Sequence, residues 1–85
     1  MNTDGLEARV REIIREVSGR QTAAVALDDD LVERMGIDSL EGLQILAALE
    51  KRLEVRFPDE KLGELRTIHQ ILEAVRRGRR EEDSR

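Results

Sequence analysis

Apolar residues near the N-terminus recur every three or four positions, with charged residues between them. This spacing places the apolar side chains on one face of an amphipathic helix. The apolar positions are Leu6, Val10, Ile13, Ile14 and Val17. Asp4, with Glu7 three residues later, has the pattern of an N-terminal capping box, and Ser18-Gly19 is a typical helix end. The pattern therefore predicts a helix that begins at Asp4 and ends at Ser18.

The most apolar helical segment is residues 39–53, and it carries two apolar stripes. Asp38 precedes it as a predicted N-cap, with Glu41 three residues later. At about 100° per residue, one stripe consists of Gly42, Ile45, Leu46, Leu49 and Leu53, and the other of Leu40, Leu43 and Ala47. A single bundle core does not readily bury both stripes. We therefore expect the second stripe to stay exposed and to contact partners, the alternative being a wider buried face.

Between these two helices, residues 20–37 are too irregular for a long helix and too apolar for a free loop. We predict a long, packed connection with one helical turn at residues 31–35, capped from the run Asp28-Asp29-Asp30. The three aspartates do not match a calcium loop, which needs alternating ligands, a central Gly and a late Glu. No metal site is therefore expected.

After the second helix, residues 54–58 form a short connector, because Pro58 disfavours helix at the residue before it. Residues 59–65 are then predicted to form a short helix with Leu62 and Leu65 facing inward. A helix this short depends on packing for its stability, so it is the element expected to move most easily.

The last helix is predicted to open at Thr67, which with Gln70 makes another capping box, and to end at Gly78. Its inner stripe consists of Ile68, Ile71, Leu72 and Val75. Residues 79–85 remain as a charged tail that is expected to be disordered.

These elements predict an all-α fold: a small four-helix bundle with three longer helices, a short third helix and a long loop between the first two. The 85 residues leave room for one domain, which we place at residues 1–78. The chain has no cysteine, which excludes disulfides and thiolate zinc sites. No apolar run is long enough for a membrane span or a signal peptide, so we expect a monomeric, cytoplasmic protein without membrane insertion.

The net charge of −4 is unevenly distributed. Residues 1–75 carry 10 basic and 16 acidic groups, a balance of −6, whereas residues 76–85 have a balance of +2. In residues 28–41, six acids stand against one base, Arg34. The folded part should therefore repel nucleic acid and attract basic protein surfaces, mainly by raising association rates.

Ser39 is the candidate for chemistry, because it lies in the first turn of the second helix. Unpaired N–H groups and the helix dipole favour a phosphate at such a place, so its hydroxyl is a suitable attachment point for a phosphodiester. Catalysis by Ser39 itself is not expected. His69 is the only histidine, and no glycine of a nucleophile elbow follows the serine.

The segment Gly36-Ile37-Asp38-Ser39-Leu40, followed by Leu43, Leu46, Leu49 and Leu53, resembles the acyl carrier protein family. The resemblance extends over residues 30–75 and includes Phe57-Pro58-Asp59 and Thr67-Ile68. It implies that Ser39 carries 4'-phosphopantetheine from coenzyme A, whose thiol holds an acyl group as a thioester. It also implies a carrier rather than an enzyme.

The resemblance implies partners as well: a phosphopantetheinyl transferase and the acyl-loading, condensing and acyl-transfer enzymes of fatty acid, specialised lipid or polyketide biosynthesis. We expect Asp38 and Glu41 to attract these partners, and Leu40, Leu43 and Ala47 to contact them. A fatty acyl cargo is expected to insert beside the second helix. The predicted pocket consists of Ile45, Leu46, Leu49, Phe57, Leu62, Leu65, Ile68 and Ile71.

Two departures from the family pattern leave alternatives open. Gln44 stands where an acid is common, and Lys51-Arg52 makes the central helix less acidic than usual, so the partners should differ accordingly. An aminoacyl or peptidyl carrier would work by the same mechanism, although Asp38 before Ser39 differs from the usual lead-in of that group. An unmodified helical adaptor that binds through Leu40, Leu43 and Ala47 is the alternative from another class.

Overall fold

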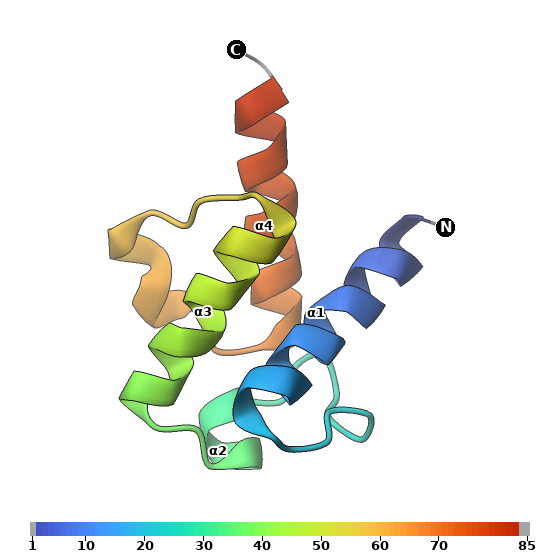
Figure 1. Ribbon diagram of the computed structural model, residues 1–85, viewed down its shortest axis with the longest axis vertical. Coiled ribbons are helices and arrows are strands. Elements are labelled where there is room, and N and C mark those ends of the chain that lie inside the picture. The colour runs from blue at the N-terminus through green and yellow to red at the C-terminus, as the bar shows by residue number, and fades with distance from the viewer. Residues whose placement is uncertain (1, 84–85) are drawn as a thin grey trace.

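A computed structural model describes the backbone of residues 2–83 and the side chains of residues 5–78. This part of the chain is helical and contains no strand. Its elements are α1 (Asn2–Ser18), α2 (Leu31–Met35), α3 (Ser39–Leu53), the 3-10 helix η1 (Asp59–Glu64) and α4 (Ile68–Asp83) (Figure 1). The predicted all-α fold with three longer helices is therefore confirmed.

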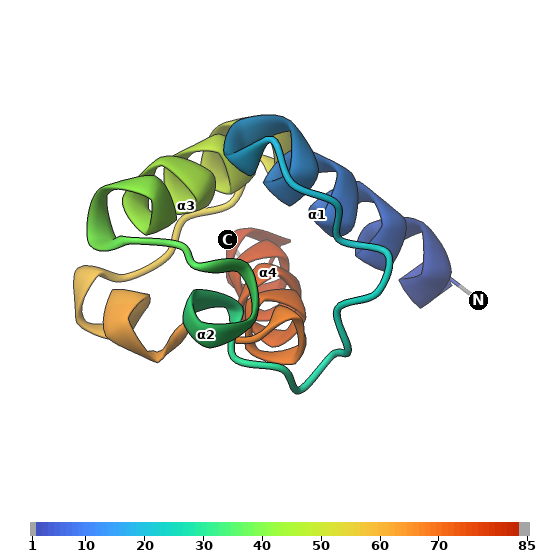
Figure 2. The same ribbon diagram turned by 90° about the horizontal axis from the view of Figure 1, so that it is seen from below.

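The three long helices surround one core. α1 packs against both α3 and α4. In Figure 1, α3 and α4 both run upward, because the connection through η1 returns the chain to the lower end of α3. Figure 2 shows η1 beside α3 and α2 beside the start of α4, so these two short elements cover the same side of the bundle.

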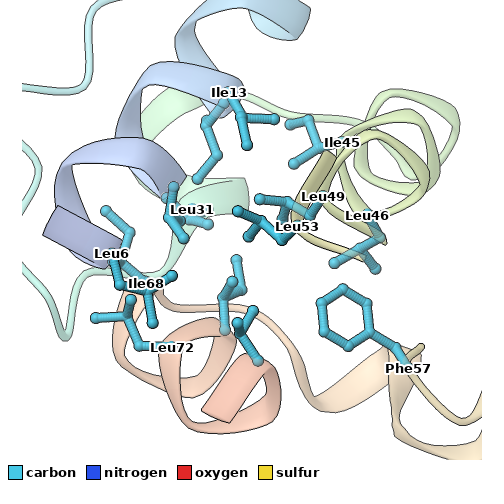
Figure 3. Close-up of a cluster of buried hydrophobic side chains, with 14 of the residues drawn as sticks. Leu6, Ile13, Leu31, Ile45, Leu46, Leu49, Leu53, Phe57, Ile68 and Leu72 are labelled. Carbon is cyan, nitrogen blue, oxygen red and sulfur yellow. The ribbon is translucent and has the colours of Figure 1, made fainter. Parts of the chain in front are cut away.

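The core is built from branched aliphatic side chains, one methionine and one aromatic ring. Figure 3 shows Leu6 and Ile13 of α1, Leu49 and Leu53 of α3, and Leu72 of α4 directed toward a common centre. Each such residue buried from water contributes about 1.5–3 kcal/mol. η1 contributes no fully buried residue: its Leu62, like Leu65 directly after it, is only partly buried against the core. The side of the bundle covered by η1 is therefore the least firmly packed.

The ends of α1 show one confirmed boundary and one error. Gly19 has a φ of 73°, and its N–H donates to the Arg15 carbonyl at 2.8 Å, which ends the helix as predicted. The start at Asp4 was wrong, because α1 begins at Asn2. The pattern of Asp4 and Glu7 therefore lies within α1 instead of marking its start.

The connection between α1 and α3 is packed, as predicted. The Arg11 guanidinium donates to the carbonyls of Thr22 at 2.6 Å and Val25 at 2.7 Å. In return, the buried Thr22 hydroxyl donates to the Arg11 carbonyl at 3.1 Å. The predicted single turn is α2, where Asp30 Oδ1 accepts the N–H groups of Val32 and Glu33. One arginine of α1 thus holds the loop that leads to α3.

The capping box of α4 is complete. Thr67 Oγ1 accepts the N–H of Gln70 at 3.0 Å, and Gln70 Oε1 accepts the N–H of Thr67 at 3.1 Å. The predicted end at Gly78 was wrong, since α4 continues to Asp83. Gly78 is buried inside the helix, where a Cβ atom would lie 3.4 Å from Val55 Cβ. This is an ordinary contact distance, so the connector packs against α4 at Gly78 and the helix continues past it.

The predicted tail of residues 79–85 thus begins within α4, and its residues 84–85 lie outside the described residues. In residues 2–83, no helix is both long and apolar enough to cross a bilayer.

Candidate functional site

Ser39 is the first residue of α3 and is exposed. Asp38 precedes it with extended backbone, and Asp38 Oδ1 accepts the N–H of Glu41 at 2.8 Å. This is the predicted N-cap, and it fixes the point at which the helix starts. The Ser39 hydroxyl therefore stands in the first turn, at the end of the helix dipole that favours negative charge.

Two residues before the cap hold Ser39 in place relative to α2. Gly36 ends α2 with a φ of 69°, a conformation that glycine adopts without strain. Ile37, the residue between Gly36 and Asp38, is buried. The short link from α2 to α3 is thus anchored in the core, while Ser39 remains accessible.

The second half of the predicted capping box at α3 does not form as expected. Glu41 Oε1 lies 3.0 Å from Arg20 Nη1, in the loop that follows α1, instead of turning back to the N–H of Asp38. The hydrogen bond is charge-assisted at both ends, which makes it stronger than one to a neutral N–H. Sequence reasoning did not identify Arg20 as part of this region.

A second ion pair joins α2 to the segment before α4. Arg66 Nε and Nη2 lie 2.9 and 2.8 Å from Asp30 Oδ2, and the N–H of Leu31 donates to the Arg66 carbonyl at 2.8 Å. Partial desolvation acts to raise the pKa of Asp30. The N–H bonds from Glu33 and Val32 and the charge of Arg66 outweigh this effect, so the pKa of Asp30 is lowered from its ordinary value.

An apolar groove of about 610 Å³ lies beside Ser39, between α2, α3 and η1. Ser39 and Asp38 are among its lining residues, and Arg66 is the cation that lines it. Five members of the predicted cargo pocket line this groove: Ile45, Leu46, Leu62, Leu65 and Ile71. The structure therefore brings the serine and most of the predicted pocket together.

Three members of the predicted pocket lie elsewhere. Leu49 and Ile68 are completely buried in the core and do not line the groove. Phe57 points toward Leu46 in Figure 3, but it lines a separate groove of about 500 Å³ between the connector and α4. Helical spacing correctly predicted that Leu49 and Ile68 face inward. It could not predict which inward-facing residues line the groove and which lie in the core behind it.

The second stripe of α3 is exposed, as expected. Leu40 and Leu43 have exposed fractions of 66% and 53%, and Ala47 is exposed as well. Val32 of α2, at 45%, is the third large apolar residue exposed within residues 5–78, and it lines the groove with Ser39. Sequence reasoning missed Val32. In a helix of five residues whose ends are buried, Leu31 and Met35, the residue after the first must face outward.

No metal site is present among the described residues, where no three His, Asp or Glu side chains lie together. His69 is exposed, and its Nε2 lies 3.4 Å from a Glu73 carboxylate oxygen on the next turn of α4. His69 is not among the residues that line the groove with Ser39.

Comparison with known proteins identifies the family. Residues 8–75, which include Ser39, match the family model described as "Phosphopantetheine attachment site". The chain is also 26% identical over 73 residues to an acyl carrier protein from Trieres chinensis, covering 86% of this chain and 91% of the relative. The family match spans most of the chain, so this protein belongs to the phosphopantetheine attachment family, whose members are carriers rather than enzymes.

Proposed function

We propose that this protein is an acyl carrier in which the phosphopantetheine arm is attached to Ser39 Oγ. The observation that carries the proposal is the position of Ser39, which is exposed at a capped helix start and lies beside an apolar groove. The similarity to an acyl carrier protein agrees with this function. The proposed carrier domain is residues 1–78, which contain the family match over residues 8–75.

The residues around Ser39 suit this group. When bound, the arm supplies a thiol that holds the cargo as a thioester. The first turn of α3 offers N–H groups and the positive end of the helix dipole to a phosphate on Ser39. Asp38 Oδ1 accepts the N–H of Glu41, and this hydrogen bond fixes the first turn of α3 at the attachment point.

An acyl cargo is favoured over an aminoacyl one by the character of the groove. Its walls include Ile45, Leu46, Leu62, Leu65 and Ile71, and each methylene removed from water is worth about 0.8 kcal/mol. A charged aminoacyl group would gain no comparable stabilisation there. The pathways that fit an acyl cargo are fatty acid, specialised lipid and polyketide biosynthesis. The exposed side of α3 carries few acids, because Gln44, Lys51 and Arg52 are exposed there.

Partner enzymes are proposed to dock beside Ser39. These are the phosphopantetheinyl transferase and the loading, condensing and acyl-transfer enzymes. Leu40, Leu43 and Ala47 provide an exposed apolar ridge on α3, and Val32 extends it onto α2. The acidic balance of residues 1–75 attracts basic partner surfaces over longer distances, with Asp38 the acid nearest to Ser39.

The attachment site is tested by intact mass after incubation with coenzyme A and a phosphopantetheinyl transferase. The wild-type protein should gain the mass of one phosphopantetheine, and Ser39→Ala should gain none while keeping its helical circular dichroism spectrum. Ser18→Ala, at the opposite end of a helix, is the matched control and should be modified like the wild type. Modification of Ser39→Ala would show that another residue carries the arm.

A further inference from the structure

Arg20 occupies an unusual position for a surface arginine, because it connects two elements distant in sequence at the edge of the candidate site. It follows Gly19, which turns the chain away from α1 with a φ of 73°. The N–H of Arg20 donates to Ser18 Oγ at 3.1 Å, and its Nη1 donates to Glu41 Oε1 at 3.0 Å. The end of α1 is thereby linked to the first turn of α3, two residues after Ser39.

Glu41 is constrained on both sides by this arrangement. Its backbone N–H is held by Asp38 Oδ1 at 2.8 Å, and its carboxylate is held by Arg20. Its side chain is 20% exposed, so the charge lies near the surface but under the guanidinium. A partner that approaches α3 therefore meets Arg20 together with Glu41 rather than an isolated carboxylate.

The same compensation recurs in the acidic segment of residues 28–41. Its sequence has six acids and one base, but three of the carboxylates are paired in the structure. The pairs are Arg34 with Asp29 at 3.4 Å, Arg66 with Asp30 at 2.8 Å and Arg20 with Glu41 at 3.0 Å. Asp28, Glu33 and Asp38 have no ion-pair partner within residues 5–78. Of the three pairs, only that of Arg20 includes a residue of α3.

We propose that Arg20 is a specificity-determining residue of this carrier: it neutralises Glu41 beside Ser39 and so weakens the attraction of basic partner surfaces. The proposal rests on the proposed function, in which partner enzymes reach Ser39. Charges at the rim of an interface act mainly on the association rate and its salt dependence. Removal of Arg20 should leave the Glu41 carboxylate unpaired and raise the association rate of partners that present positive charge.

The test measures kcat/KM for modification by a phosphopantetheinyl transferase whose docking face is basic, with coenzyme A as donor. At an ionic strength of about 0.15 M, where charges act over roughly 8 Å, Arg20→Ala should raise kcat/KM by between about 1.5-fold and fivefold. At about 1 M salt, where this range falls to roughly 3 Å, the difference should largely disappear. Arg20→Lys keeps the charge and should stay close to the wild type.

A double-mutant cycle separates the local pair from a change in net charge. In the Glu41→Gln background, Arg20→Ala should have a smaller effect, because no carboxylate is left there to pair directly with a cation of the partner. Arg15→Ala is the matched control. Arg15 is 42% exposed and paired with a glutamate, Glu12, but this pair lies within α1 and does not involve a residue of α3. Its removal should leave kcat/KM near the wild-type value.

The possible results distinguish failure of the Arg20 proposal from failure of the proposed carrier function. An Arg20→Ala protein that is modified more slowly than the wild type, or at the same rate at about 0.15 M ionic strength, overturns the role of Arg20. An equal acceleration in the Glu41→Gln background, or in Arg15→Ala, assigns the effect to net charge and also overturns it. Failure of the wild-type protein to be modified at all contradicts the proposed function instead.

Discussion

Gly78 is a buried position of α4 that has room for one more carbon atom. A Cβ atom at this position would lie 3.4 Å from Val55 Cβ and 3.5 Å from the Arg56 carbonyl oxygen, which are ordinary contact distances. Alanine therefore fits, and it favours helix over glycine by about 1 kcal/mol. We expect Gly78→Ala to raise the free energy of unfolding by up to about 1 kcal/mol, as measured by urea denaturation.

A larger side chain at position 78 tests the contact with the connector separately from the effect of helix propensity. Gly78→Leu must push the connector away and should lower the free energy of unfolding by about 1–3 kcal/mol. Gly5 is the control, because it is exposed in α1 and a Cβ added there would have no atom within 4 Å, so both Ala and Leu should be tolerated. Destabilisation by Gly78→Ala would mean that the connector packs more tightly against α4 than these distances indicate.

Glu41 illustrates why residue-level geometry is only partly readable from a sequence. The spacing from Asp38 to Glu41 correctly predicted the cap at the start of α3. The Glu41 carboxylate, however, has two possible donors, a nearby backbone N–H and the guanidinium of Arg20, which is 21 residues away. The spacing of residues in the sequence predicts only the first donor, the backbone N–H. The second is brought close by the packing of the loop, which a pattern of neighbouring residues does not contain.

At the level of elements, periodicity was sufficient wherever a helix buries a regular stripe. α3 begins and ends where its two stripes predicted, and α4 begins at its capping box. Errors occurred at the ends of two helices. α1 begins at Asn2, before the predicted Asp4, and α4 continues past Gly78, where a Cβ atom would meet only ordinary contacts. η1 was predicted as a short helix, and its 3-10 form is not encoded in any apolar period.

α2 owes its position to Asp30, which caps the helix and pairs with Arg66. Because the pKa of Asp30 is lowered in the folded protein, its carboxylate stabilises the fold above the unfolded-state pKa of about 3.9. That contribution is lost as the pH falls through the lower, folded-state value. Asp30→Asn keeps an oxygen for the cap but removes the charge. The variant should therefore be less stable than the wild type at pH 7, and the difference should shrink below about pH 4.

Urea denaturation at about pH 7 and about pH 3 measures this difference. Arg66→Gln, which leaves the cap intact, should reproduce part of the loss at neutral pH, and combining the two substitutions should add less than their sum. A constant difference between wild type and Asp30→Asn at both pH values would assign the whole effect to the cap and none to the charge.

In the molecule as a whole, the long helices are held by completely buried side chains, whereas η1 is not. α1, α3 and α4 each contribute completely buried residues, among them Ile14, Leu49 and Val75. η1 contributes none, and it covers the groove beside Ser39. Displacing η1 therefore exposes little apolar surface, whereas displacing a long helix would open the core. An apolar group attached at Ser39 has its least costly route into the protein at this groove.

The last prediction concerns such a cargo. A saturated chain of medium length, loaded as a thioester, should enter the groove and raise the melting temperature relative to the unloaded phosphopantetheine form. Each kcal/mol gained corresponds to roughly 4–8 °C for a domain of this size. Amide resonances should shift around Ile45, Leu46, Leu62, Leu65 and Ile71, which line the groove. Leu49 and Ile68 should shift less, because they lie in the core behind it.

Two comparisons make this prediction specific to the groove. A glycyl thioester is the matched cargo control, and it should give neither the stabilisation nor the shifts, since it has no apolar chain to bury. Leu62→Ser makes one wall polar and should reduce the difference between loaded and unloaded forms more than Leu40→Ser, whose side chain is exposed and does not line the groove. Shifts confined to the neighbourhood of Ser39, without a gain in melting temperature, would mean that the acyl chain stays in solvent. In that case the groove would serve partner contact instead of cargo storage.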